Sequence, residues 1–247
     1  MNGNAVSSEL AQHLCGLSGS PALPLDQTQP GATVWPIGRR PSLRGSVFIQ
    51  VMQGQATNPD ALRAELDRWK AELQPGADGW LGSTSGVTDD GRFIAVVRFA
   101  SEKLARRNSD RPEQDAWWSQ ASKHLVEAAF HDSTRVHIYR EGGSDQAGFV
   151  QVIQGHSPDM ERLAALGRAQ EQTMAEQAPL ILGMTVAEHA DRPGDFTQTV
   201  YFTSQQEARW FGREQPVEFD PSFAEFSTLM TDVRYFDLRD PRLDSPG

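Results

Sequence analysis

The sequence lacks three features that would each point to a class of function. It has one cysteine, Cys15, so an internal disulfide is excluded and paired-cysteine zinc spacings are absent. Its 23 Lys and Arg residues are outnumbered by 33 Asp and Glu, and a net charge of −10 argues against a nucleic-acid surface. No apolar run approaches the ~20 residues of a membrane span, and the N-terminus has no signal-peptide pattern. These absences predict a cytoplasmic protein with no metal site and no nucleic-acid or membrane partner.

One short stretch occurs twice. Residues 47–54 read VFIQVMQG, and residues 148–155 read GFVQVIQG. An internal repeat of about a hundred residues predicts two similar halves, each long enough to bury a core.

The first half alternates strand and helix signals. After the strand at 46–53, Asn58-Pro59-Asp60 has the cap, proline and acid that begin a helix, and Pro75-Gly76 ends it. A further helix is predicted over roughly 113–126. The later strands of this half are expected at Trp80–Thr88, Arg92–Ala100 and Thr134–Tyr139.

The second half repeats this plan. Ser157-Pro158-Asp159 begins its first helix, Ser204 to Glu207 form a capping box, and Asp220-Pro221 begins the last helix. The domain bounds follow as an extended arm over 1–44, domains over 45–140 and 147–239, a polar linker over 141–146 and a tail over 240–247.

Each half therefore reads β-α-β-β-α-β, which is the ferredoxin-like motif of an α+β fold. Helices cover only one face of such a sheet, so the bare faces of the two halves are expected to pack together. The prediction is two tandem ferredoxin-like repeats whose four-stranded sheets form a closed α+β barrel within one chain.

Two segments carry a resemblance to a known family. Residues 97–106 and 201–209 each run from a strand ending in an aromatic residue, through Ser, into a helix containing Ala-Arg. In this pattern each half resembles the antibiotic biosynthesis monooxygenase domain of the dimeric α+β barrel superfamily. The resemblance implies an oxygenase that oxidises a polycyclic aromatic polyketide with O2, as anthrone oxygenases or the angucycline ring-opening oxygenases do. It implies no required cofactor, with reduced flavin as the alternative. Haem is disfavoured by the residues themselves, because His124 is the only helix candidate for an axial ligand in the first half.

The resemblance also implies a pocket between sheet and helices within a half. The anthrone oxygenases line it with Asn and Trp on the third strand and with Tyr and Arg on the helices. The matching positions here are Ala95, Phe99, Ala105 and about Trp118 in the first half, and Gln198, Phe202, Ala208 and about Phe223 in the second. The strand-end aromatic is therefore kept, and an amide stands at one Asn position.

Trp117, Trp118 and His124 form the densest cluster of chemically useful residues. The tryptophans are candidates for an aromatic wall and His124 for the base that deprotonates a phenol. The alternative is that a tryptophan fills the core and that His124 sits at a helix end. This cluster favours the first half as the active one, with a reduced pocket in the second.

The remaining candidates are polar strand residues and one tryptophan. Gln50, Gln151 and Gln198 could orient a substrate, with Phe99, Phe202 and Trp210 as further lining residues. Alternatively the strand glutamines, including Gln53 and Gln154, satisfy one another across a pseudo-twofold axis. Arg98 and Tyr201 are expected to meet inside the barrel, whereas His137 and His189 are expected to be isolated surface residues.

The predicted partners are an aromatic small molecule and O2, with a homodimer as an open possibility. The sequence leaves two other functions open: a cyclase or isomerase using the same pocket, and a non-catalytic barrel that binds small molecules.

Overall fold

The computed structural model describes residues 47–140, 142–177, 181–214, 225–226 and 228–246. The predicted arm over 1–44, Cys15, the helix start at Asp220-Pro221 and Phe223 lie outside these residues. Within them, no helix is long and apolar enough to cross a membrane.

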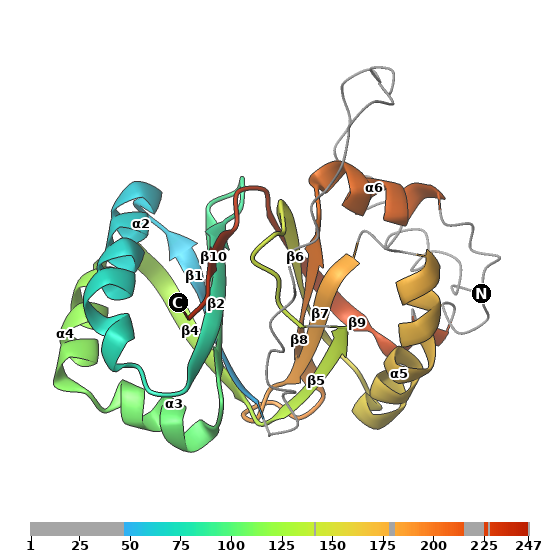
Figure 1. Cartoon of the computed structure of the whole chain (residues 1–247), viewed down its shortest axis with the longest axis horizontal. Coiled ribbons are helices and arrows are strands. Elements are labelled where there is room, and N and C mark those ends of the chain that lie inside the picture. Colours follow the sequence, from blue (N-terminus) through green and yellow to red (C-terminus); the bar gives the residue numbers. More distant parts are fainter. Residues whose placement is uncertain (1–46, 141, 178–180, 215–224, 227, 247) are drawn as a thin grey trace, which may run out of the picture.

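The chain folds into four layers, with two sheets in the middle and helices outside each (Figure 1). The first elements in chain order are β1 (Phe48–Ala56), α2 (Pro59–Arg68), β2 (Trp80–Val87), β3 (Arg92–Phe99), α3 (Glu102–Ser109), α4 (Pro112–Ala121), β4 (Leu125–Ser133) and β5 (Arg135–Arg140). The later ones are β6 (Phe149–His156), α5 (Met160–Gln177), β7 (Ile181–Glu188), β8 (Asp195–Phe202), α6 (Gln205–Glu214), β9 (Thr231–Leu238) and β10 (Arg242–Asp244). The α+β fold predicted from the repeat is confirmed.

The two sheets have the same internal arrangement. Their strand orders are β10-β2-β3-β1-β4 and β5-β7-β8-β6-β9, with antiparallel pairing throughout. The repeated stretch forms the equivalent strands β1 and β6, in which Phe48 pairs with Phe99 and Phe149 with Phe202. The repeat in the sequence therefore marks the central pairing of each sheet.

Three details of the strand prediction are wrong. The helix expected over 113–126 ends at Ala121, and after a 3-10 turn (Ser122–His124) the chain enters β4, which pairs with β1. The strand predicted at Thr134–Tyr139 is β5, but it pairs with β7 of the other sheet. The tail forms β10, which pairs with β2. All three features depend on backbone pairing between strands that are far apart in the sequence. Local residue propensities do not indicate which strands pair.

Closure of the barrel is also not found. Through the described residues the sheets keep separate hydrogen-bond ladders of five strands each. Their bare faces nevertheless pack against each other as predicted, in a cluster that includes Val51 and Val96 from the first sheet and Val152, Tyr201 and Phe236 from the second. Burying each such side chain stabilises the fold by roughly 1.5–3 kcal/mol.

Polar pairs cross the same interface. Gln154 Nε2 donates to Gln53 Oε1 over 2.7 Å, which confirms that these two glutamines satisfy each other. Arg98 Nη1 lies 3.2 Å from the Tyr201 hydroxyl, as expected, and that hydroxyl is 2.7 Å from Thr84 Oγ1.

The Gln53–Gln154 pair gives a test of the interface. Gln154→Leu should lower the free energy of unfolding by about 1–2 kcal/mol, because it leaves the Gln53 amide without its partner. Adding Gln53→Leu should recover part of that loss, since neither amide is then left unpaired. Urea denaturation of both single variants and the double variant measures the coupling, and simple additivity would contradict the proposed bridge.

Candidate functional site

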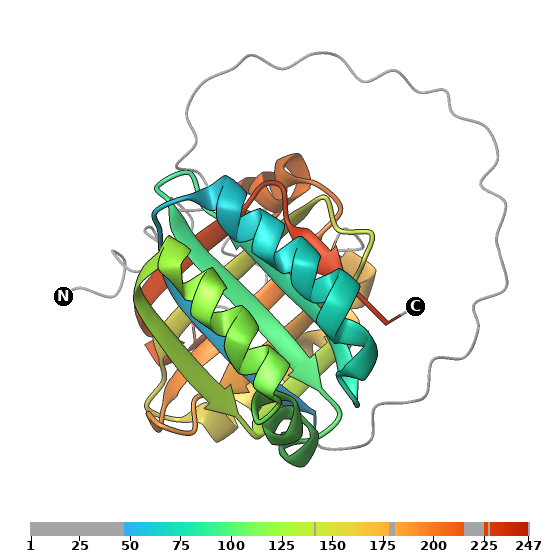
Figure 2. The same cartoon turned by 90° about the vertical axis from the view of Figure 1, so that its left-hand side faces the viewer.

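A pocket of about 240 Å³ lies between the outer face of the first sheet and the helices that cover it. Figure 2 looks onto these helices lying across the sheet. Strand residues form its floor and residues of α2 to α4, with Trp69 just beyond α2, form its walls. The lining residues are Gln50, Met52, Leu66, Trp69, Trp80, Ser83, Ser85, Ala95, Val97, Phe99, Asn108, Ser109, Gln114, Asp115, Trp117, Trp118 and Phe130.

Aromatic rings dominate the walls, and their neighbours fix them. The Trp69 and Trp80 rings meet edge to face, with centroids 5.4 Å apart. Trp69 Nε1 donates to Gln114 Oε1 over 2.8 Å, which ties this wall to α4. Trp118 meets Phe130 of β4 edge to face at 5.0 Å. Rings held in this way offer flat apolar surfaces at fixed angles.

Local backbone features aim these side chains. After α2 the helix widens into a π-helical turn over Trp69–Leu73, and Trp69 is its first residue. Such turns occur frequently at functional sites because they re-orient one side chain. Adjacent positions on α4 cannot share a face, so Trp117 is buried while Trp118 is half-buried. Trp117 is fixed further by its Nε1 donating to the carbonyl of Glu65 over 2.8 Å.

The polar side of the pocket centres on Gln50. Its Nε2 donates to Asp132 Oδ1 over 2.9 Å, and Asp132 forms an ion pair with Arg106 at 2.7 Å. These two contacts in series fix the orientation of the Gln50 amide. Among the residues lining the pocket, Asp115 alone carries a carboxyl group, and it is exposed at the pocket's edge.

The structure brings together four of the predicted site residues: Gln50, Phe99, Trp117 and Trp118. His124 is not among the lining residues. It ends the 3-10 turn after α4, where its carbonyl accepts a hydrogen bond from the Thr57 amide over 2.9 Å.

The second-half candidates lie on the outer, helix-covered side of the other sheet. Gln151 Nε2 donates to Asp237 Oδ1 over 2.9 Å, repeating the Gln50–Asp132 pair. Gln198 Nε2 lies 2.9 Å from Met184 Sδ. Phe202 packs in the core with Phe149 at 6.2 Å. The side chain of Trp210 lies outside the described residues.

Sequence reasoning missed Trp69, Trp80, Phe130 and Asp115 as lining residues. Trp69 lies on the apolar face of the first predicted helix, where a core role was the natural interpretation. Phe130 belongs to β4, which was not predicted. For Asp115 the sequence carried no signal beyond its place in the first turn of a helix.

His189 also departs from its prediction as an isolated surface residue. It is 5% exposed, and its ring stacks on that of His131 with centroids 4.3 Å apart and 2° between the planes. Burial, together with the neighbouring His131, lowers the pKa of His189 to about 4. His189 is therefore neutral near pH 7 and can offer a nitrogen lone pair.

The comparisons with known proteins show the fold. No model of a protein family matches the sequence, and no curated protein matches it. Three similar solved structures have 11–12% identity and 82% of this chain covered. A protein of Lactobacillus acidophilus NCFM, provisionally assigned as a monooxygenase, has a TM-score of 0.65 and 97% of its own chain covered. An anthrone oxidase-like protein has a TM-score of 0.61 with 95% of its chain covered. A mutant of chlorite dismutase from Candidatus Nitrospira defluvii has a TM-score of 0.52 with 92% of its chain covered. Because these enzyme names differ, the likeness does not select a reaction.

Proposed function

We propose that the protein binds a flat aromatic phenol in the first-half pocket and oxidises it with O2. The observation that carries this proposal is that the rings of Trp69, Trp80, Trp117 and Trp118 line the pocket together with the fixed amide of Gln50. Two of the neighbours with this fold carry names that agree with the proposed reaction, a monooxygenase and an anthrone oxidase-like protein.

The volume of the pocket limits the size of the substrate. At about 240 Å³ the pocket lies just below the roughly 300 Å³ at which drug-sized ligand pockets begin. Two or three fused rings therefore suit it better than a four-ring polyketide. An anthrone fits both the size and the chemistry, because its ring ketone acidifies the CH2 across the central ring and its enol tautomer is a phenol.

The reaction needs a base and a dry cavity. Removal of a ring CH2 proton gives an electron-rich anion, which adds O2 to form a peroxide anion at that carbon. The base returns the proton to this anion, which gives the hydroperoxide. The hydroperoxide loses water, so CH2 and O2 become C=O and H2O, and the ring electrons are the only reductant. The proposed base is Asp115, the carboxylate at the pocket's edge, and the Gln50 amide orients the phenol oxygen. No cofactor is required in this scheme, and reduced flavin remains the alternative.

The test is oxygen uptake by the full-length protein with anthrone, and with two-ring and four-ring phenols for comparison. We expect uptake with anthrone in the absence of added metal or flavin, and one 18O atom from 18O2 in the new carbonyl. A product of unchanged mass without uptake would identify a cyclase or isomerase. Quenching of tryptophan fluorescence without any turnover, with or without reduced flavin, would identify a binding protein.

Trp118 provides a separate test of the pocket. Trp118→Ala removes a half-buried wall and should weaken anthrone binding by about tenfold, since ring stacking contributes about 0.5–1.5 kcal/mol beyond the lost area. Fluorescence titration measures the dissociation constant. Because Phe226 lies in the other half, Phe226→Ala is the control, and equal weakening by both variants would contradict the assignment of the pocket.

A further inference from the structure

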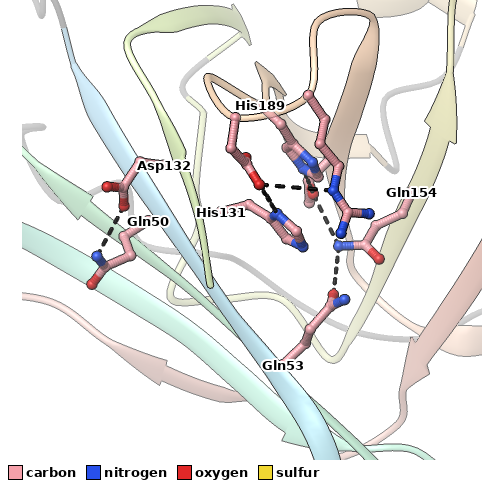
Figure 3. A network of polar contacts seen from close by, with 9 residues as sticks. Gln50, Gln53, His131, Asp132, Gln154 and His189 are labelled. Atoms are coloured by element: carbon pink, nitrogen blue, oxygen red, sulfur yellow. Dashed lines mark hydrogen bonds and ion pairs between the residues drawn. The ribbon is translucent and has the colours of Figure 1, made fainter. Parts of the chain in front are cut away.

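A second polar cluster lies where the two sheets meet, away from the pocket. It contains His131 of β4 and His189 of the turn after β7, which Figure 3 shows together. Asp191 of the same turn is its third member. His131 Nδ1 is 3.2 Å from Asp191 Oδ2. One potential ligand atom from each of the three residues lies within 4.8 Å of the others. Two imidazoles and a carboxylate thus converge from both sheets.

His189 has one nitrogen in use and one without a partner. Its Nε2 is 2.8 Å from Thr197 Oγ1, which Gln154 Nε2 also approaches to 3.2 Å. Its Nδ1 is fully buried and has no hydrogen-bond partner in the described part of the chain. Leaving such an atom unpaired costs about 1–3 kcal/mol, so a ligand that bonds to Nδ1 would recover this free energy. A hydrogen-bond partner on the other ring nitrogen, here Thr197, is the usual support of a metal-bound histidine.

The fold does not require these residues, because the equivalent place in the other half lacks them. Val51 pairs with His131 on β4, whereas its counterpart Val152 pairs with Phe236 on β9. Phe236 packs there beneath the guanidinium of Arg92, at 4.6 Å.

The turns differ in the same way. The His189 amide donates to Asp195 and the Thr88 amide donates to Arg92, so threonine stands in the place of His189. The histidine pair therefore occurs at only one of the two equivalent positions of the repeat.

We propose that His131, His189 and Asp191 bind one divalent transition-metal ion, with Zn²⁺ as the probe ion. Two histidines and one carboxylate form a recognised ligand set for such ions and leave a position open for water. His189 and Asp191 come from one turn and His131 from the other sheet, so a bound ion would cross-link the two sheets.

Binding requires two local adjustments. Parallel rings direct their lone pairs in parallel planes, so one imidazole must turn about its Cβ–Cγ bond to face the same ion as the other. Asp191 must also loosen its contact with Arg192, which is 3.8 Å long and exposed. The Asp191 carboxylate is 49% exposed and gives the ion a route from solvent.

Calorimetric titration of the metal-stripped full-length protein with Zn²⁺ tests the site. We expect one ion per chain, and at a roughly hundredfold excess over Kd a rise in melting temperature of about 5–10 °C. Asp191→Asn and His131→Phe, the latter copying Phe236, should each weaken binding by about 100-fold or more and abolish the rise. Asp191→Asn changes an exposed group and should keep the fold, which circular dichroism verifies.

Two control variants separate this site from other histidines and acids. Asp90→Asn changes the corresponding turn of the other half, and His156→Gln removes the half-buried His156–Asp195 pair. Both should bind Zn²⁺ as the unaltered protein does. Absence of binding, or affinity that survives Asp191→Asn, would overturn the proposal. His131 faces the sheet interface while its neighbour Phe130 lines the pocket, so failure of this site leaves the proposed oxidation untouched.

Discussion

Asp115→Asn is expected to lower the rate of oxygen uptake with anthrone by about 10²–10⁴-fold, the usual range for a positioned acid–base group. Asparagine keeps the size and polarity of the side chain but cannot accept the proton. Binding of the aromatic should change little, because the tryptophan walls remain. The loss should shrink at high pH, where the substrate ionises in solution. Steady-state uptake against pH, with kcat and KM separated, measures each part.

His124→Ala is the matched control, because His124 is the base predicted from the sequence. Its place at the end of the 3-10 turn, outside the pocket lining, leads us to expect turnover within about twofold of the unaltered protein. A large loss in His124→Ala with normal turnover in Asp115→Asn would restore His124 as the base. Normal turnover in both variants would leave the amide of Gln50 as the polar group to test next.

The core of the fold was predictable because it depends on local signals that occur twice. The strand repeat and the Asn58 cap, whose side chain accepts from the Ala61 amide, are both found. The packing of the bare sheet faces followed from the absence of helices to cover them. Two things failed: β4 was not predicted, and the partners of β5 and β10 were not foreseen, because each of these strands completes the other half's sheet.

The site was less predictable for the same physical reason. Trp117 and Trp118 are adjacent in sequence and could be picked out directly, whereas Trp80 and Phe130 reach the pocket only through strand pairing. The stacking of His131 on His189 depends on packing between the sheets, between residues far apart in the sequence. No periodicity in the sequence reports such a contact.

Both adjacent tryptophans line the pocket, and Trp117 should be the one that also stabilises the fold. Trp117 is 4% exposed, and its Nε1 donates to the Glu65 carbonyl, which joins α4 to α2. Trp117→Ala should lower the free energy of unfolding by about 3–5 kcal/mol, through lost burial and the cavity left behind. Trp117→Phe keeps most of the ring but loses that hydrogen bond, so about 1–2 kcal/mol is expected.

Trp118→Ala is the matched control, since Trp118 is half-buried and packs on the exposed Phe130. It should cost about 1 kcal/mol or less of stability while weakening the aromatic ligand. Urea denaturation and ligand titration of the three variants measure both quantities. If Trp118→Ala destabilised the chain as much as Trp117→Ala and left ligand affinity unchanged, Trp118 would be a core residue. The proposed pocket would then lack a ligand-binding wall on this side, because the exposed Phe130 alone could not hold an aromatic ligand in place.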